Sequence, residues 1–452
     1  MSHVTTSHAA PKARGAHERP LVTRGLRREQ DKRRRRRLRV PADTLVLGID
    51  LARERQAASF SHDGQILGRR RVNCAAHEID RLFPEAQAIA ERHTLPRILV
   101  AFEPAGLYWY LAAEACERAG VDYVLVHGLT VKREREITRY TLEKTDPRDA
   151  DLISLLPAQG KFLDTRLPAT AERDALAQLA RDYFLVRSHS AAERTRLSNF
   201  WTRLLPEFFT VLKEPTSNTA LAVSAALAPL SELTRLSPRS WLARVRRAAG
   251  GQRILASRAA ALLPLFKEAH ADPVRRSGEG MPVRIRHAAE RRRLLEAQKL
   301  DIRQEMLARY AAFEEHAVLD SIPGSDPFYN ACVLGLVGDF NLFGDPRTLP
   351  KLAGSEVNHF SSGDRDGSSH ISHRGRSALR AAAYQQARLL VRRNDHYRSR
   401  FFHLIHRTDR PNLLELPAYV AVMNSYLRTA HALVTRKQLY LPPEQRPNPW
   451  RH

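Results

Sequence analysis

The first third of the chain alternates short apolar runs with amphipathic segments, and the spacing of these runs predicts strands and helices. Strands are predicted at 44 to 51, 56 to 60, 65 to 72, 97 to 102 and 121 to 126, and helices near 76 to 92 and at 106 to 119. The Asp63-Gly64 pair between the second and third runs is typical of a hairpin turn. A hairpin start followed by strands that alternate with helices indicates an α/β domain.

From about 170 to 316 the pattern becomes helical. One stripe steps by three and four residues, through Leu176, Leu179, Tyr183, Val186, Ser190, Glu193, Leu197, Phe200 and Leu204. Ser190 and Glu193 interrupt its apolar character, so a core helix within one chain and an intermolecular coiled coil are both compatible with it. We expect a basic arm at 1–40, a catalytic domain at 43–165, a helical or coiled-coil region at 166–316, a mainly α C-terminal domain at 317–400 and a tail at 401–452.

Two acidic residues follow predicted strands of the first domain. Asp50 ends the run 44 to 50, and Glu103 ends the run 97 to 103. Ligands of open α/β sheets bind outside the carboxyl ends of the strands, so these two carboxylates are expected at one edge. The order of the elements and the acids together favour a ribonuclease-H-like (RuvC-like) fold.

A third acidic segment is Lys144-Thr145-Asp146-Pro147-Arg148-Asp149. Pro147 favours the start of a helix, and Asp146 and Asp149 would share a face of it. The four carboxylates are oxygen ligands of the kind that Mg²⁺ prefers, and two such ions about 4 Å apart can clamp a phosphodiester exchange. An N-cap at Asp146 with a favourable helix-dipole contact at Asp149 is the structural alternative.

The charge of the chain points to a polyanionic partner. The 452 residues contain 73 Lys and Arg against 49 Asp and Glu, a net charge of +24. Residues 1 to 40 hold thirteen basic residues against three acidic ones, and we expect this arm to bind nucleic acid unless it is merely a solvated tail. Its densest part is Arg33, Arg34, Arg35, Arg36 and Arg37. The three cysteines show no disulfide or zinc spacing.

The C-terminal part contains two candidate sites. The turn Ile322-Pro323-Gly324 resembles that of a helix-hairpin-helix, but Asp326 would repel phosphate if it pointed outward, and a simple connector is the alternative. A loop rich in serine and glycine follows, from Ser361 to Ser369, with Arg365 and Arg374 able to balance charge on a phosphate. Such loops are usually exposed connectors.

Several of these motifs resemble those of the DEDD transposases of insertion-sequence family 110. The resemblance is carried by Gly48-Ile49-Asp50, Glu103-Pro104-Ala105-Gly106-Leu107-Tyr108, Lys144 to Ala150, Ile322-Pro323-Gly324, Phe343, Ser361-Ser362-Gly363 and Ile371-Ser372-His373-Arg374-Gly375. It implies a DNA transposase or recombinase that uses Mg²⁺ at Asp50, Glu103, Asp146 and Asp149. It also places the serine nucleophile at Ser362, with Ser361 as the alternative register.

The resemblance further implies a structured noncoding guide RNA, DNA of the element ends and target, and a homo-oligomer. Two other functions remain open at this point. One is a metal-only nuclease similar to Holliday-junction resolvases, in which the serine loop is structural. The other is a nucleic-acid-binding protein without catalysis. No apolar run is long enough to span a bilayer, so we expect a cytoplasmic, nucleoid-associated protein without a membrane partner.

Overall fold

The computed structural model describes residues 36, 39–104, 106–139, 146–163, 170–272, 280–359, 369–407 and 413–442. They belong to two compact units, Met1–Leu167 and Pro168–His452, which we describe separately. Among the described residues, no helix is both long and apolar enough to cross a lipid bilayer.

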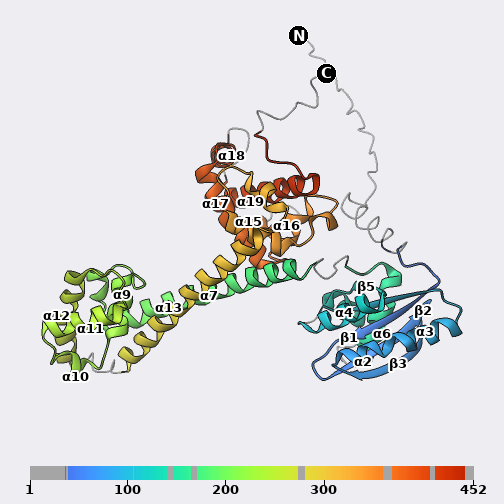
Figure 1. Cartoon of the computed structure of the whole chain (residues 1–452), viewed down its shortest axis with the longest axis horizontal. Helices are drawn as coiled ribbons and strands as arrows, with labels where there is room; N and C mark the ends of the chain where they lie inside the picture. Colours follow the sequence, from blue (N-terminus) through green and yellow to red (C-terminus); the bar gives the residue numbers. More distant parts are fainter. Residues whose placement is uncertain are drawn as a thin grey trace, which may run out of the picture. The chain divides into compact units, whose positions relative to one another are not determined.

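The first unit is built on a five-stranded mixed sheet in the order β3-β2-β1-β4-β5 (Figure 1). The strands are β1 (Thr44–Asp50), β2 (Arg55–His62), β3 (Gln65–Asn73), β4 (Arg97–Phe102) and β5 (Asp122–Leu125). β2 pairs antiparallel with both β1 and β3, whereas β4 pairs parallel with both β1 and β5. The predicted strands are all confirmed, and their ends differ from the predicted ones by at most two residues.

Helices cover both faces of this sheet. They are α2 (Ala76–Asp80), α3 (Leu82–Arg92), α4 (Tyr108–Ala119), α5 (Gly128–Arg139), α6 (Asp146–Leu155) and the 3₁₀ turn η1 (Pro157–Gln159). Leu45 and Leu47 pack in one core with residues of α3 and α4, while Val46 packs in another with residues of α5 and α6. A strand that is buried on both faces is apolar at every position, which explains the unbroken run in β1.

The helix predicted near 76 to 92 is instead two helices, α2 and α3, separated at Arg81. Pro84 lies in the first turn of α3. Proline has no N–H to donate to the carbonyl four residues earlier, here that of Asp80, and its ring clashes with that carbonyl. The missing hydrogen bond and the clash account for the break between the two helices at Arg81.

Gly48 in β1 allows α6 to lie directly on the sheet. A Cβ atom at this position would be 2.6 Å from the Ala150 carbonyl oxygen and 2.7 Å from the Ser154 Cα, both backbone atoms of α6. Because a helix backbone cannot yield as a side chain does, only glycine permits this packing. α6 carries two of the predicted metal ligands, so Gly48 contributes to their position.

We therefore expect Gly48→Ala to lower the free energy of unfolding of the first unit by about 3 kcal/mol, the upper end of overpacking costs. Urea denaturation followed by circular dichroism measures it. Gly68→Ala in β3 is the matched control, since a Cβ there would lie 3.6 Å from the Phe60 ring, an ordinary contact. Equal midpoints for the two variants would contradict the packing argument.

The second unit is mainly helical. Its helices are α7 (Ala171–Leu204), α8 (Phe208–Val211), α9 (Asn218–Ala226), α10 (Leu230–Leu233), α11 (Pro238–Ala249), α12 (Ala256–Ala271), α13 (Met281–Tyr310), α14 (Glu315–Asp320), α15 (Pro327–Val337), α16 (Thr348–Leu352), α17 (Ser377–Arg393), α18 (Asp395–Ile405) and α19 (Glu415–Arg436). The other elements are the 3₁₀ turn η3 (Phe340–Leu342) and the antiparallel strands β6 (Val357–His359) and β7 (Ser369–Ile371).

The long helix α7 runs alongside α13 of the same chain (Figure 1). Glu172 contacts Arg309, and Glu193 contacts Arg291, so the two helices are antiparallel. Glu193 is buried at the polar position of the predicted stripe. Burial alone would raise the pKa of Glu193, but hydrogen bonds and charge from Arg291 and Arg196 hold it below its usual value. The stripe thus packs within one chain, and its acid is neutralised there.

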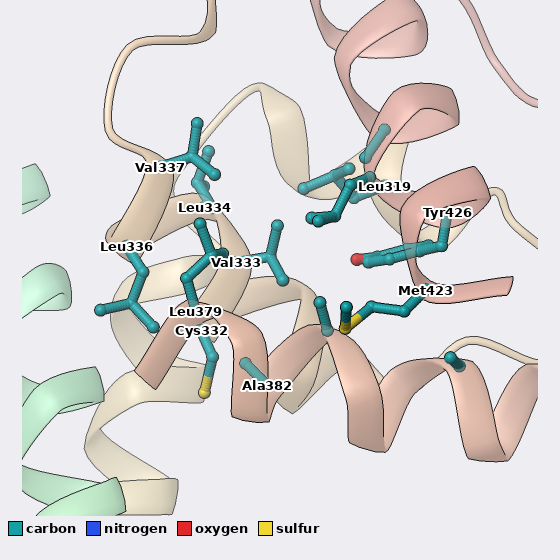
Figure 2. Close-up of a cluster of buried hydrophobic side chains, with 14 of the residues drawn as sticks. Leu319, Cys332, Val333, Leu334, Leu336, Val337, Leu379, Ala382, Met423 and Tyr426 are labelled. Atoms are coloured by element: carbon teal, nitrogen blue, oxygen red, sulfur yellow. The ribbon is translucent and has the colours of Figure 1, made fainter. Parts of the chain in front are cut away.

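Two hydrophobic cores lie at different parts of this unit. The first gathers residues from the start of α7, the end of α13 and α14 to α19; Figure 2 shows some of its side chains, among them Leu334 and Val337 of α15, Leu379 of α17 and Met423 of α19. The second is formed by residues from the end of α7 through α12 to the start of α13. The segment 401–452, predicted as a tail, contains α19, whose residue Tyr426 is fully buried in the first core.

The turn at Pro323 and Gly324 is packed inside the unit. Asn394 donates a hydrogen bond to the Pro323 carbonyl, and a Cβ on Gly324 would meet the backbone of Arg393. Asp326 caps α15 by accepting from the Phe328 amide and also pairs with Arg303. These contacts favour the connector interpretation of the turn over a phosphate-binding one.

Candidate active site

The ends of β1 and β4 bring two predicted carboxylates to one edge of the sheet. The strands are parallel, and Ile49 lies opposite Phe102. Asp50 and Glu103 are the next residues, so they leave the sheet side by side, and both are half-buried. This arrangement follows from the register alone.

The start of α5 leaves space for Glu103. The carboxyl carbon of Glu103 lies 2.7 Å from the place that a Cβ of Gly128 would occupy. Any other residue at 128 would displace this carboxylate. Gly128 is thus a site residue that sequence reasoning missed, because it follows β5 without an acidic or nucleophilic side chain to mark it.

α6 begins at Asp146, in agreement with the helix start expected at Pro147. Asp149 is buried one turn later, and Nη1 of Arg135 in α5 lies 2.9 Å from each of its carboxylate oxygens. The side chain of Asp146 lies outside the described residues. Asp149 thus faces a cation of its own chain, and Arg135 is a second residue that the sequence did not indicate.

A further buried acid, Asp151, lies two residues after Asp149 and faces β2 and β3. Ser59 donates a hydrogen bond of 2.8 Å to it, and Arg69 donates two of 2.9 Å. The hydrogen bonds that Arg69 donates to Asp151, together with the charge of Asp151, raise the pKa of Arg69. Asp151 therefore joins α6 to the sheet, whereas Asp149 joins α6 to α5.

The predicted carboxylates fit a metal site only in part. Among the described residues, no group of three or more His, Cys, Asp and Glu side chains is gathered closely enough to hold an ion. The carboxylates of Asp50, Glu103 and Asp149 are nevertheless of the hard oxygen type that Mg²⁺ takes. Arg135 supplies to Asp149 the positive charge that a cation would supply.

We expect Arg135→Gln to destabilise the first unit by about 3 kcal/mol in the absence of divalent metal, because it leaves the buried Asp149 carboxylate without its partner. Thermal unfolding in EDTA measures this. Arg118→Gln, which breaks the exposed pair with Asp80, should cost less than about 1 kcal/mol. If both substitutions cost the same, the Asp149 carboxylate does not depend on Arg135.

The predicted serine site lies only partly within the described residues. Ser361, Ser362 and Arg365 fall outside them, between β6 and β7. Arg374 follows β7 and is exposed, and His373 has a left-handed backbone with φ of 52°. Of the basic arm, Arg33, Arg34, Arg35 and Arg37 also fall outside, while the Arg36 guanidinium lies 6.0 Å from the centre of the Phe162 ring.

Two family models match the chain, one in its N-terminal half and one in its C-terminal half. One, a transposase model of the DEDD type from IS110 elements, matches residues 47–210, which include β1, β4 and α6. The other, described as the transposase IS116/IS110/IS902 family, matches residues 316–403, which include β6 and β7. Together they cover more than half of the chain. No curated protein matches it.

The mixed sheet with acids at its edge and the matched models define a DNA transposase, an enzyme that recombines DNA. The chain belongs to the IS110 family of transposases, as its motifs predicted.

Proposed function

We propose that this transposase cleaves and exchanges DNA strands through Ser362 and a divalent cation, Mg²⁺, held by Asp50, Glu103, Asp146 and Asp149 of a ribonuclease-H-like domain. The single observation that carries the metal site is the parallel register of β1 and β4, which brings Asp50 and Glu103 to one edge. The crossing of α6 over Gly48 supports it, since Asp149 lies on that helix.

The chemistry is a transesterification. The Ser362 hydroxyl attacks a phosphodiester, its oxygen forms a bond to phosphorus, and one bridging P–O bond breaks. The serine hydroxyl loses its proton to water, and the oxygen of the released strand end takes up a proton from water and leaves as a hydroxyl. When bound, Mg²⁺ neutralises charge that builds on the phosphate oxygens. Arg365 in the loop and Arg374 after β7 would hold the phosphate.

The proposal includes a structured noncoding RNA that pairs with donor and target DNA, and a multimeric protein. The family resemblance supports both. The net charge of +24 is compatible with holding two nucleic-acid partners, because Lys and Arg side chains attract the phosphate backbone. The basic arm at residues 1–40 is proposed to supply part of that contact.

The deciding experiment incubates the protein with DNA from the ends of the element, with RNA transcribed from its flanks, in Mg²⁺ or in EDTA. A denaturing gel then separates free DNA from protein-bound DNA. A covalent adduct that forms only in Mg²⁺ supports the proposal. Cleaved DNA without an adduct would instead support the metal-only nuclease.

A further inference from the structure

A hollow of about 800 Å³ opens beside the β6-β7 hairpin in the second unit. Its walls come from four parts of the unit: the segment before α16, the two hairpin strands, α18, and α19 with the residues just before it. This volume lies within the range of small-ligand sites.

Three arginines from different elements line this hollow. They are Arg347 before α16, Arg400 on α18 and Arg428 on α19. Among the described residues, none of these guanidinium groups pairs with a carboxylate. The one acidic residue of the lining, Glu356, forms an ion pair with Lys351, 3.5 Å away.

The arginines are close enough to affect one another. Partial burial and the positive charges of Arg400 and Arg347 lower the pKa of Arg428 from its usual value. Like charges that converge without an acid destabilise the protein, so an anion in the hollow would relieve a repulsion that already exists. Guanidinium groups match the geometry of phosphate oxygens.

The lining also includes His370, His373 and Asn424, but most of the rest of it is apolar. Val357, Leu416 and Val420 form part of the wall, and the first two are 45% and 62% exposed. An inorganic anion would make no use of such a surface. A nucleotide combines a phosphate with a sugar and a base, and it can satisfy both kinds of wall at once.

We propose that this hollow binds one nucleotide of a DNA strand, with its phosphate on Arg347, Arg400 and Arg428 and its sugar and base against the apolar wall. We choose DNA as the ligand because the two strands that line the hollow, β6 and β7, come directly before and after the segment that contains Ser362 in the sequence. The choice of DNA as the ligand rests on the proposed function.

The test uses the full chain and a fluorescent single-stranded DNA, and anisotropy measures Kd over a range of salt concentrations in EDTA. Arg400→Gln and Arg428→Gln should each weaken binding about tenfold. Each should also reduce the slope of log K against log salt by about 0.7, the value for one phosphate contact with a single strand. Arg235→Gln is the matched control, because Arg235 is exposed, pairs with no acid among the described residues and lies outside the hollow.

A further variant tests the contribution of the apolar wall independently of the charges. Leu416→Ala should weaken binding about threefold through lost apolar contact and leave the salt slope unchanged. None of these side chains is in the hydrophobic core, so no variant should unfold below the temperature of the wild type. The two arginine variants should unfold at that temperature or slightly above it, because each removes a like charge.

The assignment is overturned if the two arginine variants behave like Arg235→Gln, if Leu416→Ala binds as the wild type does, or if only an RNA strand of the same sequence is affected. Because EDTA prevents metal-dependent cleavage, this result does not depend on whether Ser362 is the nucleophile. If no covalent adduct forms but the arginine variants still bind DNA more weakly, the proposed reaction at Ser362 is wrong and the proposed nucleotide site stands.

Discussion

Glu103→Gln is expected to reduce Mg²⁺-dependent strand cleavage by about a thousandfold or more, while the protein keeps its fold and its DNA binding. A metal contributes several kcal/mol to a phosphodiester reaction, and losing a charged ligand forfeits most of this. Glutamine has nearly the same size as glutamate, so it still fits against Gly128. Single-turnover cleavage at saturating protein concentration, with Mg²⁺ varied, measures the effect.

The matched control is Asp43→Asn, which removes a carboxylate from the same unit at an exposed pair with Arg97. It should cleave at the wild-type rate. Asp151→Asn provides a second comparison, since it weakens the contact with Arg69 and should lower stability more than rate. If Glu103→Gln cleaves DNA as fast as the wild type, the ends of β1 and β4 do not form the metal site.

Ser362→Ala is expected to abolish the covalent protein–DNA adduct, because the alanine side chain has no oxygen to bond to phosphorus. Removal of a nucleophile typically costs several orders of magnitude in rate, so the loss should be complete on a denaturing gel. DNA binding should be unchanged, since a single neutral hydroxyl is lost. The gel and an anisotropy titration on the same preparation measure both quantities.

Ser361→Ala is the control for the register of the loop and should retain adduct formation. If Ser361→Ala loses the adduct and Ser362→Ala keeps it, the nucleophile is the neighbouring serine. Recombination by Ser362→Ala at a near wild-type rate would favour the metal-only reaction and make the loop a connector.

The sheet of the first unit could be predicted because each of its strands is marked by a pattern of neighbouring residues in the sequence. Each strand is a run of apolar residues, and a strand covered on both faces needs no alternation to be recognised. The break between α2 and α3 was missed, although Pro84 marks it, because the apolar pattern continues through the break. Asp50 and Glu103 were brought to one edge by the parallel register, which follows from the alternation of strands and helices.

The partners of the acids could not be predicted. Arg135 and Asp149 are fourteen residues apart, and their contact depends on how α5 packs against α6. Asp151 and Arg69 meet only because α6 crosses the sheet. Glu193 looked like a defect in an apolar stripe, whereas Arg291 on a distant helix neutralises it. Such pairs depend on tertiary packing, and a single sequence does not encode them as a pattern.

The arrangement of the two cores in the second unit has a consequence for the order in which the nascent chain folds. The core from the end of α7 to the start of α13 uses one continuous stretch, with Trp201 stacked on Phe208 at 3.9 Å. Leu176 and Tyr183 at the start of α7, by contrast, pack with residues from Met306 onward. On the ribosome, the continuous core can therefore close first, while the start of α7 waits for residues made more than a hundred positions later. Until then it presents an apolar surface that a chaperone can cover.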